Sequence, residues 1–187
     1  MHKKMPLGSG LGSSAASAVA AVVAVNALLG SPLKKAELLP FALEGERMAC
    51  GAAHADNAAP SLLGGFILIR SYTPLDVVPL NVPERLHAVV VHPHIEVKTK
   101  DAREILKKSL LLKDAIVQWG NIAGLVAGLM KSDYDLISRS LNDVVVEPVR
   151  SILIPGFNAV KAAALREGAL GCSISGSGPS VFALTTE

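Results

Sequence analysis

Long apolar runs alternate with short polar or glycine-rich breaks along the chain, and the first two runs predict helices. Residues 14–29 are mostly alanine and valine, which predicts a helix buried on nearly all sides and ended by Gly30. A second helix is expected over residues 32–50, with the Ser31 side chain as its cap. Pro40 should bend or break that helix, because proline lacks a backbone donor and clashes with the preceding turn.

Later in the chain, β-branched runs predict strands, and apolar residues three or four apart predict helices. Strands are expected at 66–70, 74–83, 86–93, 171–175 and 180–184, and helices from residue 99 and at 113–131, 134–141 and 158–167. Pro79 makes the second strand an edge strand, and Trp119 is expected to pack in a core. A domain boundary is expected between residues 84 and 85, where a Pro-Glu-Arg segment separates two strands.

The segment Pro6–Ala16 reads Pro-Leu-Gly-Ser-Gly-Leu-Gly-Ser-Ser-Ala-Ala and leads straight into the first helix. Its three glycines let the backbone turn sharply and approach a ligand closely. Ser13 and Ser14 are expected to cap the helix. Free first-turn N–H groups and the positive end of the helix dipole favour an anion, so the segment predicts a phosphate-binding loop. An ordinary Gly/Ser turn in front of a buried helix is the alternative.

Two better-known phosphate loops do not fit this segment. A Walker A loop ends in Gly-Lys-Ser/Thr, and the segment has no lysine. The dinucleotide-binding fingerprint requires a third glycine where Ser13 stands and a strand immediately before the loop, yet only five residues precede Pro6. The loop therefore belongs to another class.

Composition narrows the classes of function. The 187 residues carry a net charge of +2 and half are hydrophobic, which favours one folded domain or two small ones over disorder. Basic residues are scattered, so neither nucleic acid nor a membrane is expected as a partner. The first apolar run is broken by Ser17 and Asn26 and is too short to span a membrane, which disfavours export. Cys50 and Cys172 are expected as buried free thiols in a reducing compartment.

Several polar residues stand out against the small and apolar background. Glu44 and Glu46 are two residues apart in the second helix, so only one of them can face the start of the first helix; a solvated helix face is the alternative. Asp56 and Asn57 either cap a turn or serve a site. The two histidines that flank Pro93 have no further ligands nearby and are expected to be loop residues rather than metal ligands.

Five segments together resemble the GHMP kinases, a family that phosphorylates small metabolites with ATP. They are Pro6–Ala16, His-Ala-Asp-Asn at 54–57 with Leu-Gly-Gly-Phe at 63–66, Thr-Lys-Asp-Ala-Arg at 99–103, Glu-Pro-Val-Arg at 147–150, and Ser-Ile-Ser-Gly-Ser-Gly-Pro-Ser at 173–180. The first and last resemble the second and third signature motifs of the family. The segments follow the family's order over essentially the whole chain.

The resemblance implies that the protein binds ATP and Mg2+. The expected ATP-binding residues are Pro6, Leu7, Gly8, Ser9, Gly10, Leu11, Gly12, Ser13, Ser14, Ala15, Ala16, Gly176, Ser177 and Gly178. Ser14 and Glu46 would hold the metal, because Mg2+ on phosphates takes one or two protein oxygens. Catalytic roles are implied for Ser14, Glu46 and Asn57.

The second, third and fourth segments are similar to the homoserine-phosphorylating branch of the family. This implies phosphorylation of the L-homoserine hydroxyl by ATP, giving O-phospho-L-homoserine on the route to threonine. The substrate-binding residues implied are Asp56, Asn57, Thr99, Arg103 and Arg150. Asp56 would receive the amine and Asn57 would orient the hydroxyl. The two arginines would select an amino acid over a neutral alcohol, because a planar guanidinium grips a carboxylate with two hydrogen bonds.

The fold implied is the α+β two-domain GHMP kinase fold, with a ribosomal S5 domain 2-like N-terminal part and a ferredoxin-like C-terminal part. Residues 1–84 would be part of the ATP-binding N-terminal domain and residues 85–187 part of the C-terminal domain, incomplete at both ends. A cytoplasmic location (a plastid in a plant) and a possible homodimer are expected. The alternatives are a mevalonate- or sugar-type GHMP kinase, an inactive nucleotide-binding fragment and an exported binding protein.

Overall fold

The structure is a computed structural model that describes residues 2–97 and 99–187, without the side chains of residues 50, 99 and 100. Its contacts divide the chain into two compact units. Unit 1 contains the residues up to Leu7 and Gly12–Asn81, and unit 2 contains Gly8–Leu11 and Val82–Glu187. The boundary expected after residue 84 lies close to this division, but the middle of the glycine-rich loop belongs with the second unit.

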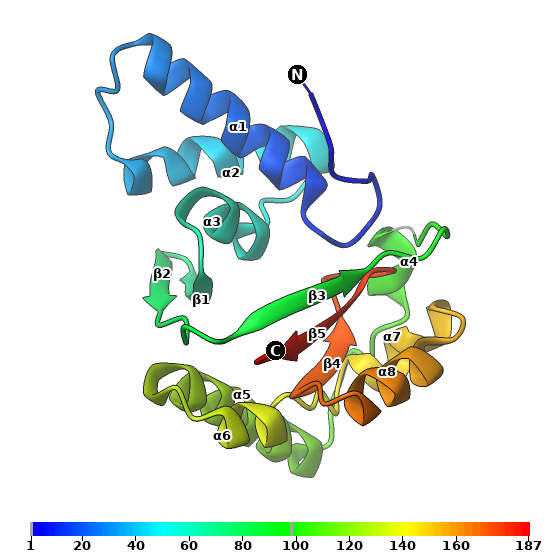
Figure 1. Cartoon of the computed structure of the whole chain (residues 1–187). Coiled ribbons are helices and arrows are strands. Elements are labelled where there is room, and N and C mark those ends of the chain that lie inside the picture. The colour runs from blue at the N-terminus through cyan, green and yellow to red at the C-terminus, as the bar shows by residue number, and fades with distance from the viewer. Residues whose placement is uncertain (1, 98) are drawn as a thin grey trace. The chain divides into compact units, whose positions relative to one another are not determined.

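Unit 1 consists of three helices and a hairpin (Figure 1). Its elements are α1 (Ser13–Leu28), the 3-10 turn η1 (Lys35–Leu38), α2 (Leu39–Cys50), α3 (Ala55–Leu63), β1 (Phe66–Tyr72) and β2 (Leu75–Leu80). Buried residues from the helices and η1 form the core, and one face of the hairpin packs against it through Ile67, Ile69, Leu75 and Val77. Both predicted strands are present, and in this two-stranded antiparallel sheet both are edge strands.

The C-terminal end of α1 agrees with the prediction, and the N-terminal end does not. At the C-terminus Gly30 has φ +81°, and the amides of Gly30 and Ser31 donate to helix carbonyls over 3.1 and 2.8 Å, which confirms the glycine stop. At the N-terminus the expected caps by Ser13 and Ser14 are wrong. Gly12 is the N-cap residue, and no side chain in the described residues caps the first turn. The Ser14 hydroxyl has another partner, on α2.

The expectation that the first helix is buried on nearly all sides is wrong. Ser13, Ala15 and Val19 are the buried residues of α1, whereas Val25 and Leu28 are 55% and 86% exposed. The physical reason is that α1 packs against α2 and α3 (Figure 1), and these neighbours cover only part of its apolar circumference within unit 1.

The segment expected as one helix over residues 32–50 is divided into η1 and α2. Pro40 lies in the first turn of α2, where its missing N–H leaves no hydrogen bond unmade, so the predicted break is confirmed. The cap at Ser31 is wrong, because Ser31 has φ 58° and η1 begins only at Lys35. Helix α3 is not predicted by the sequence pattern. It contains Pro60, and proline normally argues against a helix interior.

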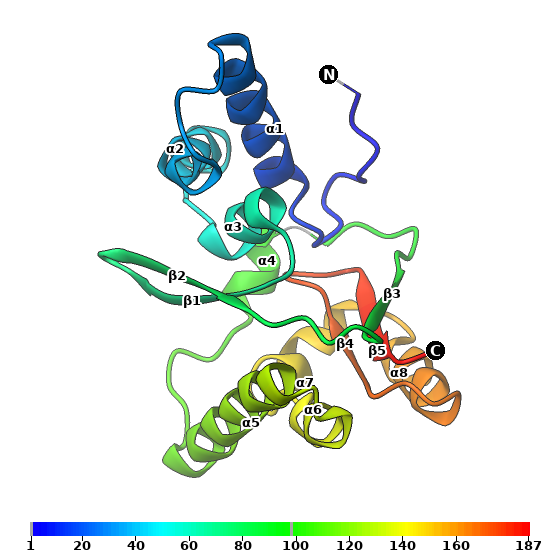
Figure 2. The ribbon, with the colours of Figure 1, turned by 60° about the vertical axis from the view of Figure 1, so that its left-hand side comes forward.

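Unit 2 combines a three-stranded antiparallel sheet with helices (Figure 2). Its elements are β3 (His87–Val91), α4 (Thr99–Glu104), α5 (Leu112–Lys131), α6 (Tyr134–Ser140), α7 (Glu147–Arg150), the 3-10 turn η2 (Ser151–Leu153), α8 (Phe157–Arg166), β4 (Gly171–Ile174) and β5 (Val181–Thr185). The strand order is β3-β5-β4, so the last strand lies in the middle. Helix α8 packs on β4 and β5 around a core of Ile154, Phe157, Cys172 and Val181.

Most elements expected in unit 2 are present at nearly the expected bounds, but one core prediction is wrong. Trp119 is 60% exposed, and Ile116 on the same helix is 56% exposed. Helix α5 buries Gly128 and Leu129 instead, near its C-terminus, where Gly128 lies close against Ile137 of α6. The apolar stripe of α5 thus contacts its neighbour through small residues rather than through the indole.

Two smaller expectations concern the cysteines and the membrane. Cys172 is a free thiol and 1% exposed, as predicted, whereas the side chain of Cys50 lies outside the described residues. No helix in the described part of the chain is both long enough and apolar enough to cross a bilayer.

Candidate functional site

Ser14, Glu46 and His54 form a polar cluster inside unit 1. The Ser14 hydroxyl donates to Oε1 of Glu46 over 2.8 Å, and Nδ1 of His54 lies 3.1 Å from the same oxygen. Ser14 is in the first turn of α1, Glu46 lies on α2 and His54 immediately precedes α3. The two residues expected to hold Mg2+ are therefore in direct contact, and a third element fixes the carboxylate.

Glu46, and not Glu44, is the glutamate that faces the start of α1. Glu46 is 2% exposed, whereas the Glu44 side chain is exposed and pairs with Arg47. Burying a carboxylate is costly unless its oxygens are paired. Oε2 of Glu46 is nevertheless buried and has no hydrogen-bond partner among the described residues. This unpaired oxygen beside a serine hydroxyl suits a hard cation that prefers oxygen ligands.

The described residues contain no cluster of three or more histidine, cysteine or acidic side chains that could bind a metal alone. A cation at Glu46 would therefore need further ligands from a bound molecule, as Mg2+ on a nucleotide has. Of the two histidines around Pro93, His92 contacts the Ser180 hydroxyl over 3.0 Å.

Asp56, Asn57 and Tyr72 form a second polar cluster in unit 1. The Tyr72 hydroxyl donates to Oδ1 of Asp56 over 3.1 Å, and the Asn57 amide lies 3.5 Å from Oδ2. The capping alternative for Asp56 and Asn57 is not supported, because His54 is the N-cap residue of α3 and no side chain caps that helix in the described residues. Gly12 touches this cluster: a methyl group there would lie 2.9 Å from Oδ1 of Asn57.

The middle of the glycine-rich loop packs directly on the turn at 176–178, within unit 2. The Ser175 hydroxyl donates to the Gly10 carbonyl over 3.0 Å, and the Ser180 amide donates to the Ser9 carbonyl over 3.2 Å. Ser9 and Ser180 are 1% and 0% exposed. Any side chain at Gly10 would collide with backbone, because a methyl group would lie 2.3 Å from the Ser175 carbonyl oxygen. Two predicted ATP-binding segments are thus in contact.

The helix that follows the loop has an N-terminus suited to an anion. Helix α1 is 16 residues long, and its first turn has neither a side-chain cap nor an acidic residue in the described chain. No carboxylate of α1 itself therefore neutralises its first N–H groups and the positive end of its dipole. A phosphate group placed there would meet backbone donors and little side-chain bulk.

Arg150, at the end of α7, is fixed by two backbone carbonyls of unit 2. Nε and Nη2 donate to the Ala102 carbonyl over 3.2 and 3.1 Å, and Nη1 donates to the Gly176 carbonyl over 2.7 Å. Burial lowers the pKa of Arg150, while Asp143 raises it and the nearby Arg103 lowers it again. The two arginines expected to bind a carboxylate therefore interact with each other, and one of them touches the turn that supports the loop.

Glu147 anchors the other end of α7, although the sequence reasoning gives it no role. Glu147 is 9% exposed, and its carboxylate accepts a hydrogen bond from the Ser173 hydroxyl over 2.6 Å and forms an ion pair with Lys161. Because α7 is only four residues long, fixing Glu147 against β4 and α8 also limits the movement of Arg150.

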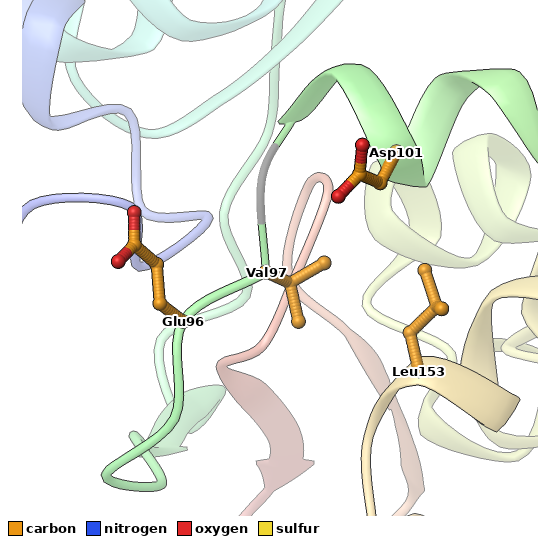
Figure 3. Close-up of a pocket in the computed structure, with 4 residues that line it drawn as sticks. All are labelled: Glu96, Val97, Asp101 and Leu153. Atoms are coloured by element: carbon orange, nitrogen blue, oxygen red, sulfur yellow. The ribbon is translucent and has the colours of Figure 1, made fainter.

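A pocket of about 220 Å³ lies in unit 2 and is lined by Glu96, Val97, Asp101 and Leu153 (Figure 3). Glu96 also packs near Gly8, where a methyl group would lie 3.4 Å from its Cγ. Two carboxylates make this pocket a poor site for phosphate, and its volume is below the roughly 300 Å³ at which ligand pockets begin. The pocket is therefore adjacent to the loop but is not the candidate anion site.

Other predicted site residues differ in their exposure to solvent. Leu7 is 76% exposed, Ala15 is fully buried, and Gly176 is exposed at the tip of the late turn. The side chain of Thr99 lies outside the described residues. Unit 1 brings together Ser14, Glu46, Asp56 and Asn57, and unit 2 brings together Gly8–Leu11, Gly176–Gly178, Arg103 and Arg150.

Sequence reasoning assigned no role to five residues that support these clusters: His54, Tyr72, Glu147, Ser175 and Ser180. Four of them lie inside the recognised segments, so their position in a motif was a usable signal. Tyr72 lies outside every motif, and its contact with Asp56 depends on an irregularity in β1 that the apolar pattern does not reveal.

Comparison with known proteins adds two family matches and one close curated relative. The profile described as the GHMP kinases N terminal domain matches residues 1–65, and that of the GHMP kinases C terminal matches residues 125–187. A homoserine kinase from Chloroherpeton thalassium is 62% identical over 185 residues, which is 99% of this chain and 58% of that protein. The chain thus spans less than two thirds of the length of such relatives.

Solved structures give matching results. The crystal structure of a homoserine kinase from Cytophaga hutchinsonii is 66% identical, with a TM-score of 0.97 over 99% of this chain and 59% of the other. A mevalonate kinase from L. major, solved with R-mevalonate, is 21% identical, with a TM-score of 0.77 over 96% of this chain and 58% of the other. At 21% identity, the similarity to this mevalonate kinase supports a shared fold and nothing further.

Proposed function

The chain belongs to the GHMP kinase family, and we propose that the full-length protein uses ATP to phosphorylate the side-chain hydroxyl of L-homoserine, giving O-phospho-L-homoserine. The α+β two-domain fold predicted for that family is the fold of this chain, incomplete relative to the family's members. Support for the substrate comes from two relatives named homoserine kinase, at 62% and 66% identity. The product is an intermediate on the route to threonine.

The glycine-rich loop and the first turn of α1 are proposed to bind the ATP phosphates through backbone N–H groups. Ser175 and Ser180 support this role, because their hydrogen bonds hold the loop at Gly10 and Ser9 before any ligand arrives. A loop that already has its bound shape loses less conformational freedom on binding. Ser177 and the two glycines beside it are proposed to act on the same phosphates.

Mg2+ fits the residues of the Ser14–Glu46 cluster. The buried, unpaired Oε2 of Glu46 offers one carboxylate ligand, and the Ser14 hydroxyl offers a second oxygen. His54 holds Oε1 and so fixes the direction in which Oε2 points. When bound, the ion would neutralise charge on the phosphate oxygens, and phosphoryl transfer depends mainly on such neutralisation and on positioning.

The arrangement of Arg150 is the observation that supports a substrate with a carboxylate group. A guanidinium has five N–H donors, and three of them are used on the Ala102 and Gly176 carbonyls, which leaves two for a carboxylate. Arg103 adds a second positive charge close by. Two like charges held near each other are unfavourable until an anion joins them. Thr99 is proposed to assist at the same place.

The amine and the hydroxyl of the substrate are assigned to unit 1. Asp56 is proposed to receive the ammonium group as its counter-charge, and Asn57 is proposed to orient the hydroxyl that attacks. These roles agree with the finding that neither side chain caps α3 in the described residues. Asn57 is also the residue that Gly12 touches, so the attacking group and the end of the phosphate loop would be neighbours.

A mevalonate-type activity is the main rival. Mevalonate also carries a carboxylate, so the two arginines do not discriminate against it; the discriminating group is Asp56, which an amine would neutralise and mevalonate would not. A sugar-type kinase would have no use for a paired guanidinium site. An inactive nucleotide-binding protein is the rival from another class, and it would bind ATP without forming ADP.

The test is a substrate panel with the full-length protein. Mg-ATP is offered with L-homoserine, R-mevalonate or shikimate, ADP formation is followed in a coupled assay, and products are identified by phosphorus NMR. We expect homoserine to be favoured by about 100-fold or more in kcat/KM. Turnover of mevalonate but not homoserine would overturn the substrate, and ATP binding without ADP formation with any substrate would support the non-catalytic rival.

The proposal also covers the location, the partners and the assembly of the protein. We propose a cytoplasmic location, or a plastid one in a plant, with no nucleic-acid or membrane partner. A homodimer is the proposed assembly, and light scattering of the full-length protein measures it directly.

A further inference from the structure

Strand β1 contains a bulge that decides which side of the hairpin Tyr72 faces. The ladder with β2 shifts register between Ile69 and Ser71, so Arg70 is an extra residue. In a regular strand, Tyr72 would point away from the side on which Ile69 lies. One extra residue reverses the alternation beyond it, and Tyr72 now pairs with Leu75, whose side chain packs against the core of unit 1.

The bulge brings the Tyr72 hydroxyl to the start of α3. There it donates to Oδ1 of Asp56 over 3.1 Å, although the tyrosine is 54% exposed. Burial and then the neighbouring Asp56 carboxylate raise the pKa of Tyr72, so the phenol keeps its proton and remains a donor at neutral pH. Bulges are common next to active sites, where they re-aim a side chain.

We propose that Tyr72 is a positioning residue for the substrate amine: its hydroxyl holds the Asp56 carboxylate in the orientation that receives an ammonium group. The proposal rests on the proposed function, since it takes Asp56 as the amine-binding group. A carboxylate oxygen accepts more than one hydrogen bond, so Tyr72 orients Asp56 without occupying it fully.

The hydrogen bond from Tyr72 lowers the conformational-entropy cost of ordering the Asp56 side chain when the amine binds. An aspartate in the exposed first turn of a helix can adopt several rotamers, and binding a cation selects one of them. A hydrogen bond from a residue on a strand selects that rotamer before the substrate arrives. This strengthens binding of the amine and does not change binding of the carboxylate or the hydroxyl. Tyr72 therefore contributes to selecting an amino acid over a hydroxy acid of the same length.

The test replaces Tyr72 by phenylalanine in the full-length protein, which removes one oxygen and retains the ring. Tyr134→Phe is the matched control, because Tyr134 lies on α6 in the other unit. The KM values for homoserine and ATP are measured together with kcat. Two competitive inhibitors are then compared: L-2-aminobutyrate, which has the amine but no hydroxyl, and 4-hydroxybutyrate, which has the hydroxyl but no amine.

For Tyr72→Phe we expect the KM for homoserine and the inhibition constant of L-2-aminobutyrate to rise by the same factor, about 3- to 10-fold. The KM for ATP, kcat and the inhibition constant of 4-hydroxybutyrate should change little, and Tyr134→Phe should resemble the unmodified protein. An equal loss for both inhibitors would assign Tyr72 a structural role instead.

A third result separates this inference from the function on which it rests. Unchanged kinetics in Tyr72→Phe, with homoserine turned over normally by the unmodified protein, would overturn the role of Tyr72 alone. Absence of homoserine turnover in the unmodified protein would overturn the proposed function as well.

Discussion

Replacing Gly10 by alanine tests whether the loop depends on its close contact with the late turn. Gly10 has φ +76°, and a methyl group there would lie 2.3 Å from the Ser175 carbonyl oxygen and 2.7 Å from that of Gly178. Gly30 is the matched control, because it has φ +81° and a methyl group there would meet no described atom within 4 Å. The two variants share the left-handed strain and differ in the collision.

The expected magnitudes follow from these contacts. Left-handed backbone costs alanine about 1–2 kcal/mol at either position. In Gly10→Ala the loop must also leave the turn, which breaks the hydrogen bonds from Ser175 to Gly10 and from Ser180 to Ser9, each worth about 1 kcal/mol. If that ~2 kcal/mol has to be restored when ATP binds, the KM for ATP rises roughly 30-fold.

The assay uses full-length protein and two measurements for each variant. Steady-state kinetics give the KM for ATP at saturating homoserine, and urea unfolding gives the loss of stability. Gly30→Ala should lose stability while keeping the KM for ATP, and Gly10→Ala should lose both. A KM for ATP that is equal in the two variants would refute the reasoning, because the collision would then have no effect on the nucleotide.

Three further predictions concern single side chains. Arg150→Ala should raise the KM for homoserine far more than that for ATP, and equal increases would remove Arg150 from the substrate role. Glu46→Gln can still accept from Ser14 but has lost its charge, so Mg2+ affinity in activity titrations should fall about 10- to 100-fold; the exposed Glu44→Gln should not differ from the unmodified protein, and an unshifted Glu46→Gln would contradict the metal site. The raised pKa of Tyr72 means that its hydrogen bond contributes fully below pH 10.0 and is lost as the pH rises through the higher folded-state value. The stability difference between the unmodified protein and Tyr72→Phe should therefore shrink only as the pH is raised above 10.0, and a difference in thermal unfolding that stays constant as the pH is raised further would argue against it.

The local features of the site could be predicted from the sequence because they depend on neighbouring residues. The loop at Pro6–Ala16 is recognisable from its glycines and serines. The spacing of Glu44 and Glu46 requires that only one of them face α1, and the resemblance selects the one that the structure buries. The helix stop at Gly30 depends on a backbone conformation that glycine adopts without strain.

Features that depend on distant packing could not be predicted. Burial of α1 depends on which elements cover it, so its largely apolar sequence led to a wrong prediction of burial at Leu28. The contact of Gly10 with Ser175 joins residues 165 apart. The bulge at Arg70 does not disturb the apolar pattern of β1, so that pattern does not reveal it. Helix α3 was not predicted because it contains Pro60, and proline is tolerated at that position only through the context of the fold.

The most direct measurement is a crystal structure of the full-length protein with a non-hydrolysable ATP analogue, Mg2+ and L-homoserine. We expect phosphate oxygens on the backbone amides of the Gly8–Ser13 segment, the ion on Glu46, and the homoserine carboxylate on the guanidinium groups of Arg103 and Arg150. A homoserine carboxylate bound away from both arginines, or phosphates bound away from that segment, would rule out this arrangement.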